Sequence, residues 1–264
     1  MIYKTTPSPR LAALFQHWEE TMIDSCFQGV MGELYTDSLK IPESAMILLG
    51  DFCFLSGKPS EALVSAALEL SGKDFLILVP RTPDWHSLIT KHYGLDAKKC
   101  TRYAIKKEPD IFDKIHLENI ISALPNGYHL HRIDRQLFEI CRKCEWCCDF
   151  VAQYTDYSMF EKHGLGIVAL KNGEPVSGAS SYSSYLNGIE IEVDTLKDYR
   201  RKGLASACAA KLILECLKRG WYPSWDAQNP WSVALAEKLG YHFDHEYTVY
   251  EIVKNKKNME GDSQ

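Results

Sequence analysis

The segment from Ile189 to Gly220 reads IEIEVDTLKDYRRKGLASACAAKLILECLKRG and contains two hydrophobic patterns in succession. Apolar and acidic residues alternate from Ile189 to Asp194, and this period of two predicts a β-strand. From Leu204 onward, apolar residues recur every three or four positions with charged residues between them, which predicts an amphipathic helix that stops at Gly220. The segment is therefore expected to form a strand, a short basic loop and a long helix.

The basic loop, Arg200-Arg201-Lys202-Gly203, lies where this helix begins. The first turn of a helix has backbone N–H groups without intrahelical partners and carries a charge of about +0.5. A glycine allows a ligand to come close to the backbone, and the three cations add to the positive field. The junction suits a phosphate or pyrophosphate, although a charged loop between two core elements would leave the same pattern.

The six residues of this junction, RRKGLA at 200–205, resemble the R/Q-x-x-G-x-G/A signature of the GNAT superfamily of acyl-CoA-dependent N-acetyltransferases. The resemblance continues through WDAQN at 225–229 and LAEKLGY at 235–241 and covers about the last half of the chain. Within the superfamily it is similar to a bacterial branch that includes the zwittermicin-resistance acetyltransferase. It implies an α/β (α+β) fold in which residues 126–253 form a GNAT domain, with a mixed, mostly antiparallel sheet flanked by helices.

The same resemblance implies acetyl-CoA as a cosubstrate. Backbone groups at the end of the strand would pair with its pantetheine arm, and amides of the loop and first helical turn would face its pyrophosphate. Two residues of the last helix would contact the lower part of coenzyme A. The residues implied in this way are Val193, Asp194, Thr195, Arg200, Arg201, Lys202, Gly203, Leu204, Ala205, Asn229 and Ser232.

Acetyl transfer to an amine also needs a group that accepts the proton of the amine. Glu190 and Glu192 share one face of the predicted strand and are the catalytic candidates, although both could equally be salt-bridged or solvated strand residues. The position that serves as base in histone-type relatives falls on Ile189. The tyrosine that many relatives use as general acid corresponds to Ala236. Either another group protonates the thiolate, or it leaves unprotonated because the pKa of a thiol is only about 8.5.

The N-terminal residues 1–125 are expected to form a separate α/β domain. Strand and helix patterns alternate from 45 to 106 in an order that is similar to the second half of a GNAT domain, but without the basic glycine loop. This domain is either a degenerate GNAT-like copy or an unrelated α/β cap. The turn-rich run LPNG at 124–127 marks the predicted boundary. Residues 254–264 have little to bury and are expected to be a disordered tail.

The composition of the chain restricts its partners and location. The net charge of −5 and the pI of about 6.0 argue against nucleic acid as a partner. No apolar run approaches the roughly 20 residues of a membrane span. The N-terminus does not resemble a secretory signal, so we expect a cytoplasmic protein that does not bind membranes. The oligomeric state is not predicted by any feature of the sequence.

Four of the nine cysteines form the motif C-x-x-C-x-x-C-C, at Cys141, Cys144, Cys147 and Cys148. Thiolates at such spacing can hold zinc, but structural zinc sites usually combine two ligand pairs across a loop, and no second pair follows here. Leu137 with three of these cysteines also fits one stripe of a helix. We therefore expect a core helix and no metal.

The sequence thus predicts an acetyl-CoA-dependent N-acetyltransferase that transfers the acetyl group directly to an amine of a small molecule. Two alternatives remain open at this point. One is a non-catalytic, coenzyme A-binding regulatory protein, since Ala236 replaces the usual acid. The other is a tandem-GNAT peptide or aminoacyl transferase, which the N-terminal half suggests.

Overall fold

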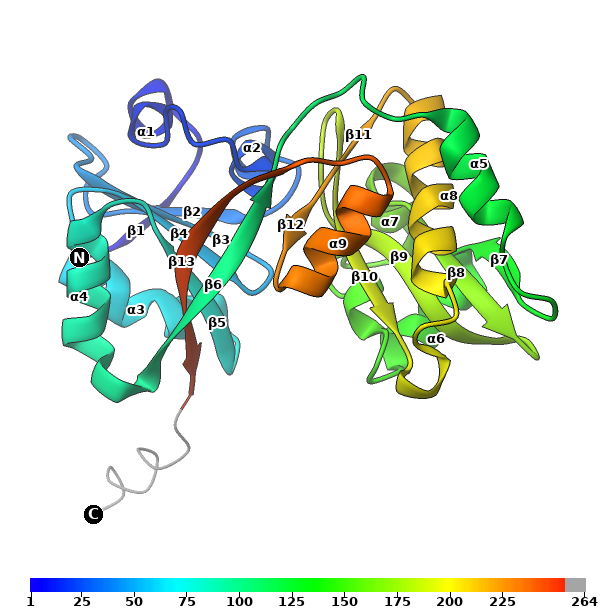
Figure 1. Cartoon of the computed structure of the whole chain (residues 1–264). Coiled ribbons are helices and arrows are strands. Elements are labelled where there is room, and N and C mark those ends of the chain that lie inside the picture. Colours follow the sequence, from blue (N-terminus) through cyan, green and yellow to red (C-terminus); the bar gives the residue numbers. More distant parts are fainter. Residues whose placement is uncertain (255–264) are drawn as a thin grey trace, which may run out of the picture. The chain divides into compact units, whose positions relative to one another are not determined.

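The computed structural model describes residues 1–254, which form two compact units (Figure 1). Unit 1 consists of Met1–Thr101 together with the segment that begins at Thr248, and unit 2 consists of Arg102–Tyr247. The predicted disordered tail lies, apart from Lys254, outside the described residues.

Unit 2 is built on a five-stranded sheet with the strand order β11-β10-β9-β8-β7. Its neighbours are antiparallel except for the parallel pair β10–β11, so the predicted mixed, mostly antiparallel sheet is confirmed. Its elements in chain order are α5 (Lys114–Ser122), β7 (His129–Arg132), α6 (Arg135–Lys143), η2 (Cys148–Phe150), α7 (Tyr157–His163), β8 (Gly166–Lys171), β9 (Glu174–Tyr185), β10 (Gly188–Thr195), η3 (Lys197–Tyr199), α8 (Leu204–Lys218), β11 (Tyr222–Ser224), β12 (Asp226–Ala227) and α9 (Pro230–Lys238).

Unit 1 has the same succession of strand pairings. Its order β1-β2-β3-β4-β5 is antiparallel up to β4, and β4–β5 is again a parallel pair. Its elements are β1 (Tyr3–Thr5), α1 (Pro9–Leu14), α2 (Thr21–Phe27), β2 (Glu33–Thr36), β3 (Ser44–Leu49), β4 (Phe52–Gly57), α3 (Glu61–Ser71), β5 (Phe75–Pro80), α4 (Pro83–Tyr93) and η1 (Gly94–Asp96). Two strands, β6 (Ala97–Ile105) and β13 (Phe243–Val253), contribute to both units.

This division differs from the predicted boundary after residue 125. Helix α5 packs along α8 and buries Leu117 completely, which places residues 102–125 in unit 2. The second half of β13 pairs antiparallel with β5, from Tyr250 opposite Leu78 to Val253 opposite Phe75. The end of the chain therefore returns to unit 1. Both contacts join segments far apart in the sequence, so local patterns could not reveal them.

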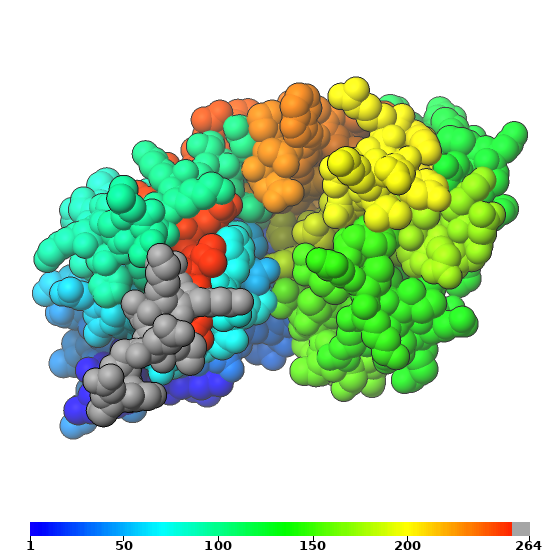
Figure 2. Space-filling model, turned by 90° about the horizontal axis from the view of Figure 1, so that it is seen from below, coloured from blue at the N-terminus to red at the C-terminus, as the bar shows by residue number. Residues whose placement is uncertain are grey.

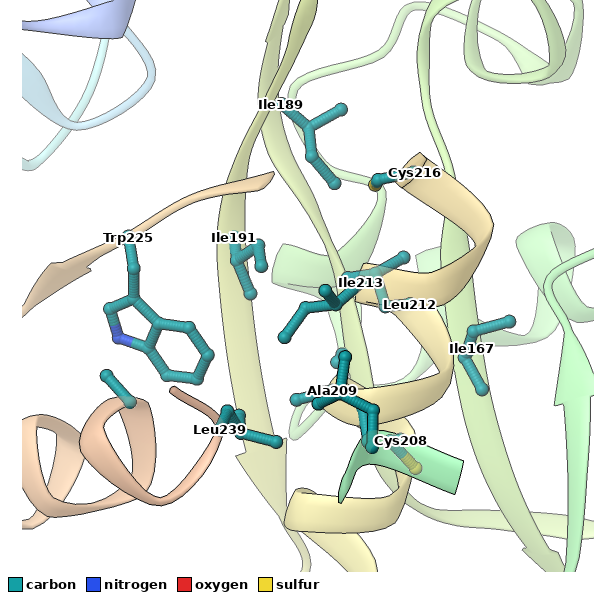
Figure 3. Packing of buried hydrophobic residues seen from close by; sticks show 14 of the residues in the cluster. Ile167, Ile189, Ile191, Cys208, Ala209, Leu212, Ile213, Cys216, Trp225 and Leu239 are labelled. Carbon is teal, nitrogen blue, oxygen red and sulfur yellow. The ribbon is translucent and has the colours of Figure 1, made fainter. Parts of the chain in front are cut away.

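The core of unit 2 lies between the sheet and α8. Ile189 and Ile191 point from β10 toward the helix, where they meet Cys216 and Ile213 (Figure 3). Because side chains alternate along a strand, Glu190 and Glu192 must point to the opposite face of the sheet. The predicted strand, loop and helix thus form. Helix α8 ends at Lys218, and Gly220 shortly after it has a left-handed backbone.

The predicted cysteine helix is wrong in its second half. Helix α6 ends at Lys143, and two tight turns follow in which the amide of Cys144 donates to Cys141 O and that of Cys147 donates to Cys144 O. These turns advance the chain by three residues instead of 3.6. As a result Cys141 and Cys147 are buried, whereas Cys144 and Cys148 are partly exposed.

The sequence predicts one strand from Tyr222 to Asp226 after the long helix, but in the structure this segment is divided. Its first three residues form β11 beside β10, but Asp226 and Ala227 form β12 and pair with β6 opposite Ala104 and Tyr103. An ion pair between Arg102 and Asp226 holds this second part. The chain therefore turns away from β10 after Ser224.

Candidate active site

The two parallel strands at the centre of unit 2 separate at a defined point. β10 and β11 are paired from Gly188 opposite Tyr222 to Glu190 opposite Ser224, and there the pairing ends. Beyond this point β10 continues to Thr195 while the other strand leaves for β6. The edge of β10 from Ile191 onward is therefore not covered by β11, and its backbone groups can accept an extended ligand as an added strand.

The basic loop connects the end of β10 to the N-terminus of α8. Arg201 and Gly203 both have left-handed backbones, with φ of 61° and 79°. Gly203 is the residue before the helix, and no atom lies within 4 Å of the position that a Cβ would occupy there. The N-terminus of this 15-residue helix is thus open beside Gly203, and the amides of a first turn can bind phosphate groups there.

The three cations of this loop have different environments. Arg200 turns back to the strand, where its Nε donates to Thr195 O at 2.9 Å and its guanidinium lies 3.4 Å from Asp194 Oδ1. The ammonium of Lys202 lies 4.8 Å from the ring centre of Tyr199. Arg201 is exposed and lines the cavity described next. The loop is thus braced by Arg200 rather than presenting three equivalent cations.

A cavity of about 600 Å³ lies over this loop, the open edge of β10 and the start of α9. Of the eleven residues expected to bind coenzyme A, the structure brings ten together around it, and Lys202 is not among its lining residues. The lining residues that the sequence reasoning missed are Tyr199, Ser206, Trp225, Gln228, Trp231 and Leu235. Several of these lie within the WDAQN and LAEKLGY segments or next to them, so those segments could have indicated them.

The start of α9 is held rigidly beside the cavity. Asn229 caps the helix, its side chain accepting a hydrogen bond from the amide of Ser232 at 2.9 Å. The indole N–H of Trp225 donates to Ser232 Oγ at 3.0 Å. The amide N–H₂ of Asn229 and the hydroxyl proton of Ser232 can still be donated to a ligand.

Glu190 and Glu192 do not line this cavity, because they project from the other face of β10. Glu190 is 5% exposed and lies in register between Ser183 of β9 and Ser224 of β11. Both of these hydroxyls are buried and have no hydrogen-bond partner among residues 1–254. A row of polar groups thus lies at the point where β10 and β11 separate.

Glu192 lies one step further along the same face and is partly buried. Burial raises its pKa to about 8, and the negative charges of Asp149 and Asp194 act in the same direction. The nearby guanidinium of Arg102 and the amide of Val193 oppose this shift. A carboxylate with a pKa near 8 is a better proton acceptor for an ammonium group than an ordinary glutamate.

The position of the usual general acid contains no polar group. Ala236 is fully buried in the core cluster next to Leu239 and Trp225, and it does not line the cavity. Tyr241 is also buried, and its hydroxyl donates to Pro223 O at 2.6 Å. Burial raises the pKa of the Cys208 thiol to about 12, so this cysteine is a protonated core residue.

Residues 1–254 contain no group of three or more His, Cys, Asp or Glu side chains placed to hold a metal ion. In the same part of the chain, no helix has the length and apolar character needed to cross a membrane.

A profile of the GNAT acetyltransferase family matches residues 12–250. The chain belongs to this family. This protein is therefore an N-acetyltransferase, and the expected family and enzyme class are confirmed.

Similar proteins agree with this assignment. The chain is 29% identical over 240 residues to the uncharacterized N-acetyltransferase YdfB of Bacillus subtilis, covering 84% of this chain and 86% of YdfB. The crystal structure of a GCN5-related N-acetyltransferase-like protein from Streptococcus suis is 48% identical, with a TM-score of 0.88 over 92% of this chain and 97% of the other. A tandem GNAT protein from the clavulanic acid biosynthesis pathway has a TM-score of 0.55 over 97% and 98% of the two chains, but at 11% identity this shows a likeness in fold alone.

Proposed function

We propose that this GNAT protein uses acetyl-CoA and transfers the acetyl group directly to an amine of a small molecule. The observation that carries the proposal is the single cavity that joins the open N-terminus of α8 to the exposed edge of β10. One end suits a pyrophosphate and the other lies beside the point where the strands separate. Its lining residues fit acetyl-CoA, which would supply the activated acetyl group.

The two faces of β10 would serve different substrates. The cavity side holds the donor, through the edge of β10, the amides of Leu204 and Ala205, and the start of α9. The opposite side carries Glu190 and Glu192 and would receive the acceptor amine. The two substrates would meet where β10 and β11 separate, after the pairing of Glu190 with Ser224.

Glu192 is the proposed proton acceptor. As the amine nitrogen bonds to the acetyl carbon, one proton passes from nitrogen to the carboxylate, and the bond from carbon to sulfur breaks. The thiolate would leave without a tyrosine donor, since Ala236 occupies that position. Glu190, in its row with Ser183 and Ser224, would relay the proton or hold the acceptor in place.

Acetyl-CoA binding provides the direct test. We expect saturating acetyl-CoA to raise the melting temperature of the protein, because a ligand bound at one hundred times its Kd adds about 2.7 kcal/mol to the free energy of unfolding. Release of free thiol with a panel of small amines then measures transfer. A melting curve that millimolar acetyl-CoA leaves unchanged would contradict the proposal.

We also propose that unit 1 is a degenerate GNAT copy. The order of elements from β1 to β6 repeats that from β7 through α9 to β13, apart from α5, β12 and the short 3₁₀ helices. The match of the family profile across both units and the fold likeness to a tandem GNAT protein support this proposal.

The counterpart of the donor site in unit 1 differs from the site in unit 2. Ser60 caps α3 with its own side chain, which accepts from the amide of Leu63. The buried Trp85 donates its indole N–H at 3.0 Å to the carbonyl oxygen of Gly57, the last residue of β4. A Cβ at Gly57 would clash with Glu43 O, so the backbone here is tightly packed. Only unit 2 would therefore bind the donor.

A further inference from the structure

The side chain of Trp231 is 80% exposed, although it belongs to the lining of the donor cavity. It lies in the first turn of α9, directly after Pro230. Its neighbour Ser232 is turned toward the protein and bonds Trp225, so Trp231 lies on a different side of the same turn. An indole in this position loses the stabilisation that burial of a large apolar side chain provides. No packing role in unit 2 accounts for it.

The cavity has a direction, which decides what Trp231 would contact. Trp225 marks its inner end, since this residue directly follows the last residue of β11 that pairs with β10. The amides of α8 and Gly203 mark the phosphate end. In acetyl-CoA the thioester, the pantetheine arm, the pyrophosphate and the adenosine follow one another in this order. The adenosine of a bound donor would therefore lie beyond the phosphate end.

We propose that Trp231 is the adenine-binding residue of the donor site, a platform on which the base stacks. This proposal rests on the proposed use of acetyl-CoA. Stacking on an aromatic ring is the usual way to bind a base without reading its hydrogen-bonding edge. Arg201, exposed on the same cavity, supplies a cation for the phosphate groups next to the base. Figure 2 shows the segments near residue 200 (yellow) and from 225 to 235 (orange) adjoining at the surface of unit 2.

The chemical consequence is selectivity for the donor. An acetyl group on free coenzyme A brings an adenosine with it, whereas one on the phosphopantetheine of a carrier protein does not. A site with an adenine platform therefore favours acyl-CoA over acyl carrier proteins. The selectivity acts on donor binding and leaves the chemical step unchanged.

Binding of two ligands to three proteins tests the proposal without any acceptor. Isothermal titration measures the Kd of coenzyme A and of 4′-phosphopantetheine, which lacks the adenosine, for the parent, Trp231→Ala and Trp231→Phe. We expect Trp231→Ala to weaken coenzyme A about tenfold, in the range found for one stacked base, and to leave the Kd of phosphopantetheine within twofold. Trp231→Phe keeps an aromatic face and should retain most of the affinity.

Trp221→Ala is the matched control, because Trp221 is partly exposed, lies 4.9 Å from the guanidinium of Arg219, and does not line the cavity. Its coenzyme A affinity should equal that of the parent. If Trp231→Ala and the parent bind coenzyme A with equal affinity, the adenine platform is wrong, while the proposed use of acetyl-CoA is unaffected. An equal loss for both ligands would also overturn the adenine platform, by placing Trp231 against the pantetheine. A parent protein that binds neither ligand would instead overturn the proposed function.

Discussion

At the scale of single residues, the sequence predicted the residues that line the cavity better than it predicted the environment of the catalytic candidates. The loop signature is local, and of the eleven residues that the family resemblance implies, ten lie around one cavity. The pKa of Glu192 is raised first by burial and is then modified by Asp149 and Arg102, which are 43 and 90 positions away in the chain. No local pattern contains that information. The turn of Arg200 toward Thr195 was likewise not predictable, because an arginine beside a phosphate site looks the same in sequence whether it braces the loop or binds the ligand.

Glu192→Gln tests the proposed base. The parent must lose a proton from Glu192 before it can accept one, so its kcat/KM should rise with pH and level off above about pH 8. Glu192→Gln should lower kcat/KM about 100-fold or more and abolish that rise. Initial rates are measured from pH 6 to 9 with an acceptor whose amine has a pKa below 6, so that the acceptor does not titrate.

The same residue links stability to pH. Its pKa in the folded state is raised above the ordinary value of 4.5, so its contribution to stability is complete below pH 4.5 and is lost as the pH rises through 8. Glu192→Gln has no such titration, so its melting temperature should rise relative to that of the parent as the pH increases from 4.5 to 8. If kcat/KM depends on pH in the same way in Glu192→Gln and in the parent, Glu192 has no part in the mechanism.

At the scale of elements, the opening of the site depends on the two-residue strand β12. It pairs with β6 through only Asp226 and Ala227, so backbone hydrogen bonds alone give it little support. The carboxylate of Asp226 accepts from Arg102 Nε at 2.6 Å and from the hydroxyl of Tyr247 at 2.7 Å. The sequence predicts one strand from Tyr222 to Asp226, because no local pattern shows where the chain leaves β10. The buried ion pair that diverts the chain joins residues 124 positions apart.

Breaking this ion pair should destabilise the protein. The side chains of Arg102 and Asp226 are 14% and 9% exposed, and removing one partner of a buried pair costs about 3–5 kcal/mol. Asp226→Ala should therefore show a clear loss in urea denaturation, whereas Arg102→Met combined with Asp226→Ala should be less destabilised than Asp226→Ala alone. The exposed pair of Lys4 and Glu33 is the control, and Lys4→Ala should cost less than about 1 kcal/mol. Equal losses for Asp226→Ala and Lys4→Ala would show that the ion pair does not hold β12.

At the scale of the whole molecule, the α/β class and most helices and strands follow from hydrophobic period and from caps. Ser60 and Asn229 cap their helices, and Gly72 ends α3 in a left-handed conformation, all at positions that the sequence indicates. The division of the chain into two units could not be predicted from these local patterns, because it is set by contacts between segments far apart in the sequence. Helix α5 precedes the LPNG turn in the sequence but packs on α8. Strand β13 pairs with β5, although nearly all of unit 2 lies between these two strands in the sequence.

The boundary after residue 125 can be tested with fragments. A fragment of residues 126–264 lacks α5, so the face of α8 that packs on Leu117 would be exposed to water, and the half of β13 that pairs with β5 would have no partner. A fragment of residues 1–125 in turn lacks the strand that covers β5. Because each fragment leaves apolar surface and strand edges uncovered, we expect neither to unfold cooperatively, while the full chain does. Thermal unfolding followed by circular dichroism measures this for each fragment. A cooperative transition of fragment 126–264 that acetyl-CoA shifts upward would show that the sequence boundary, and not the observed division into units, describes how the protein folds.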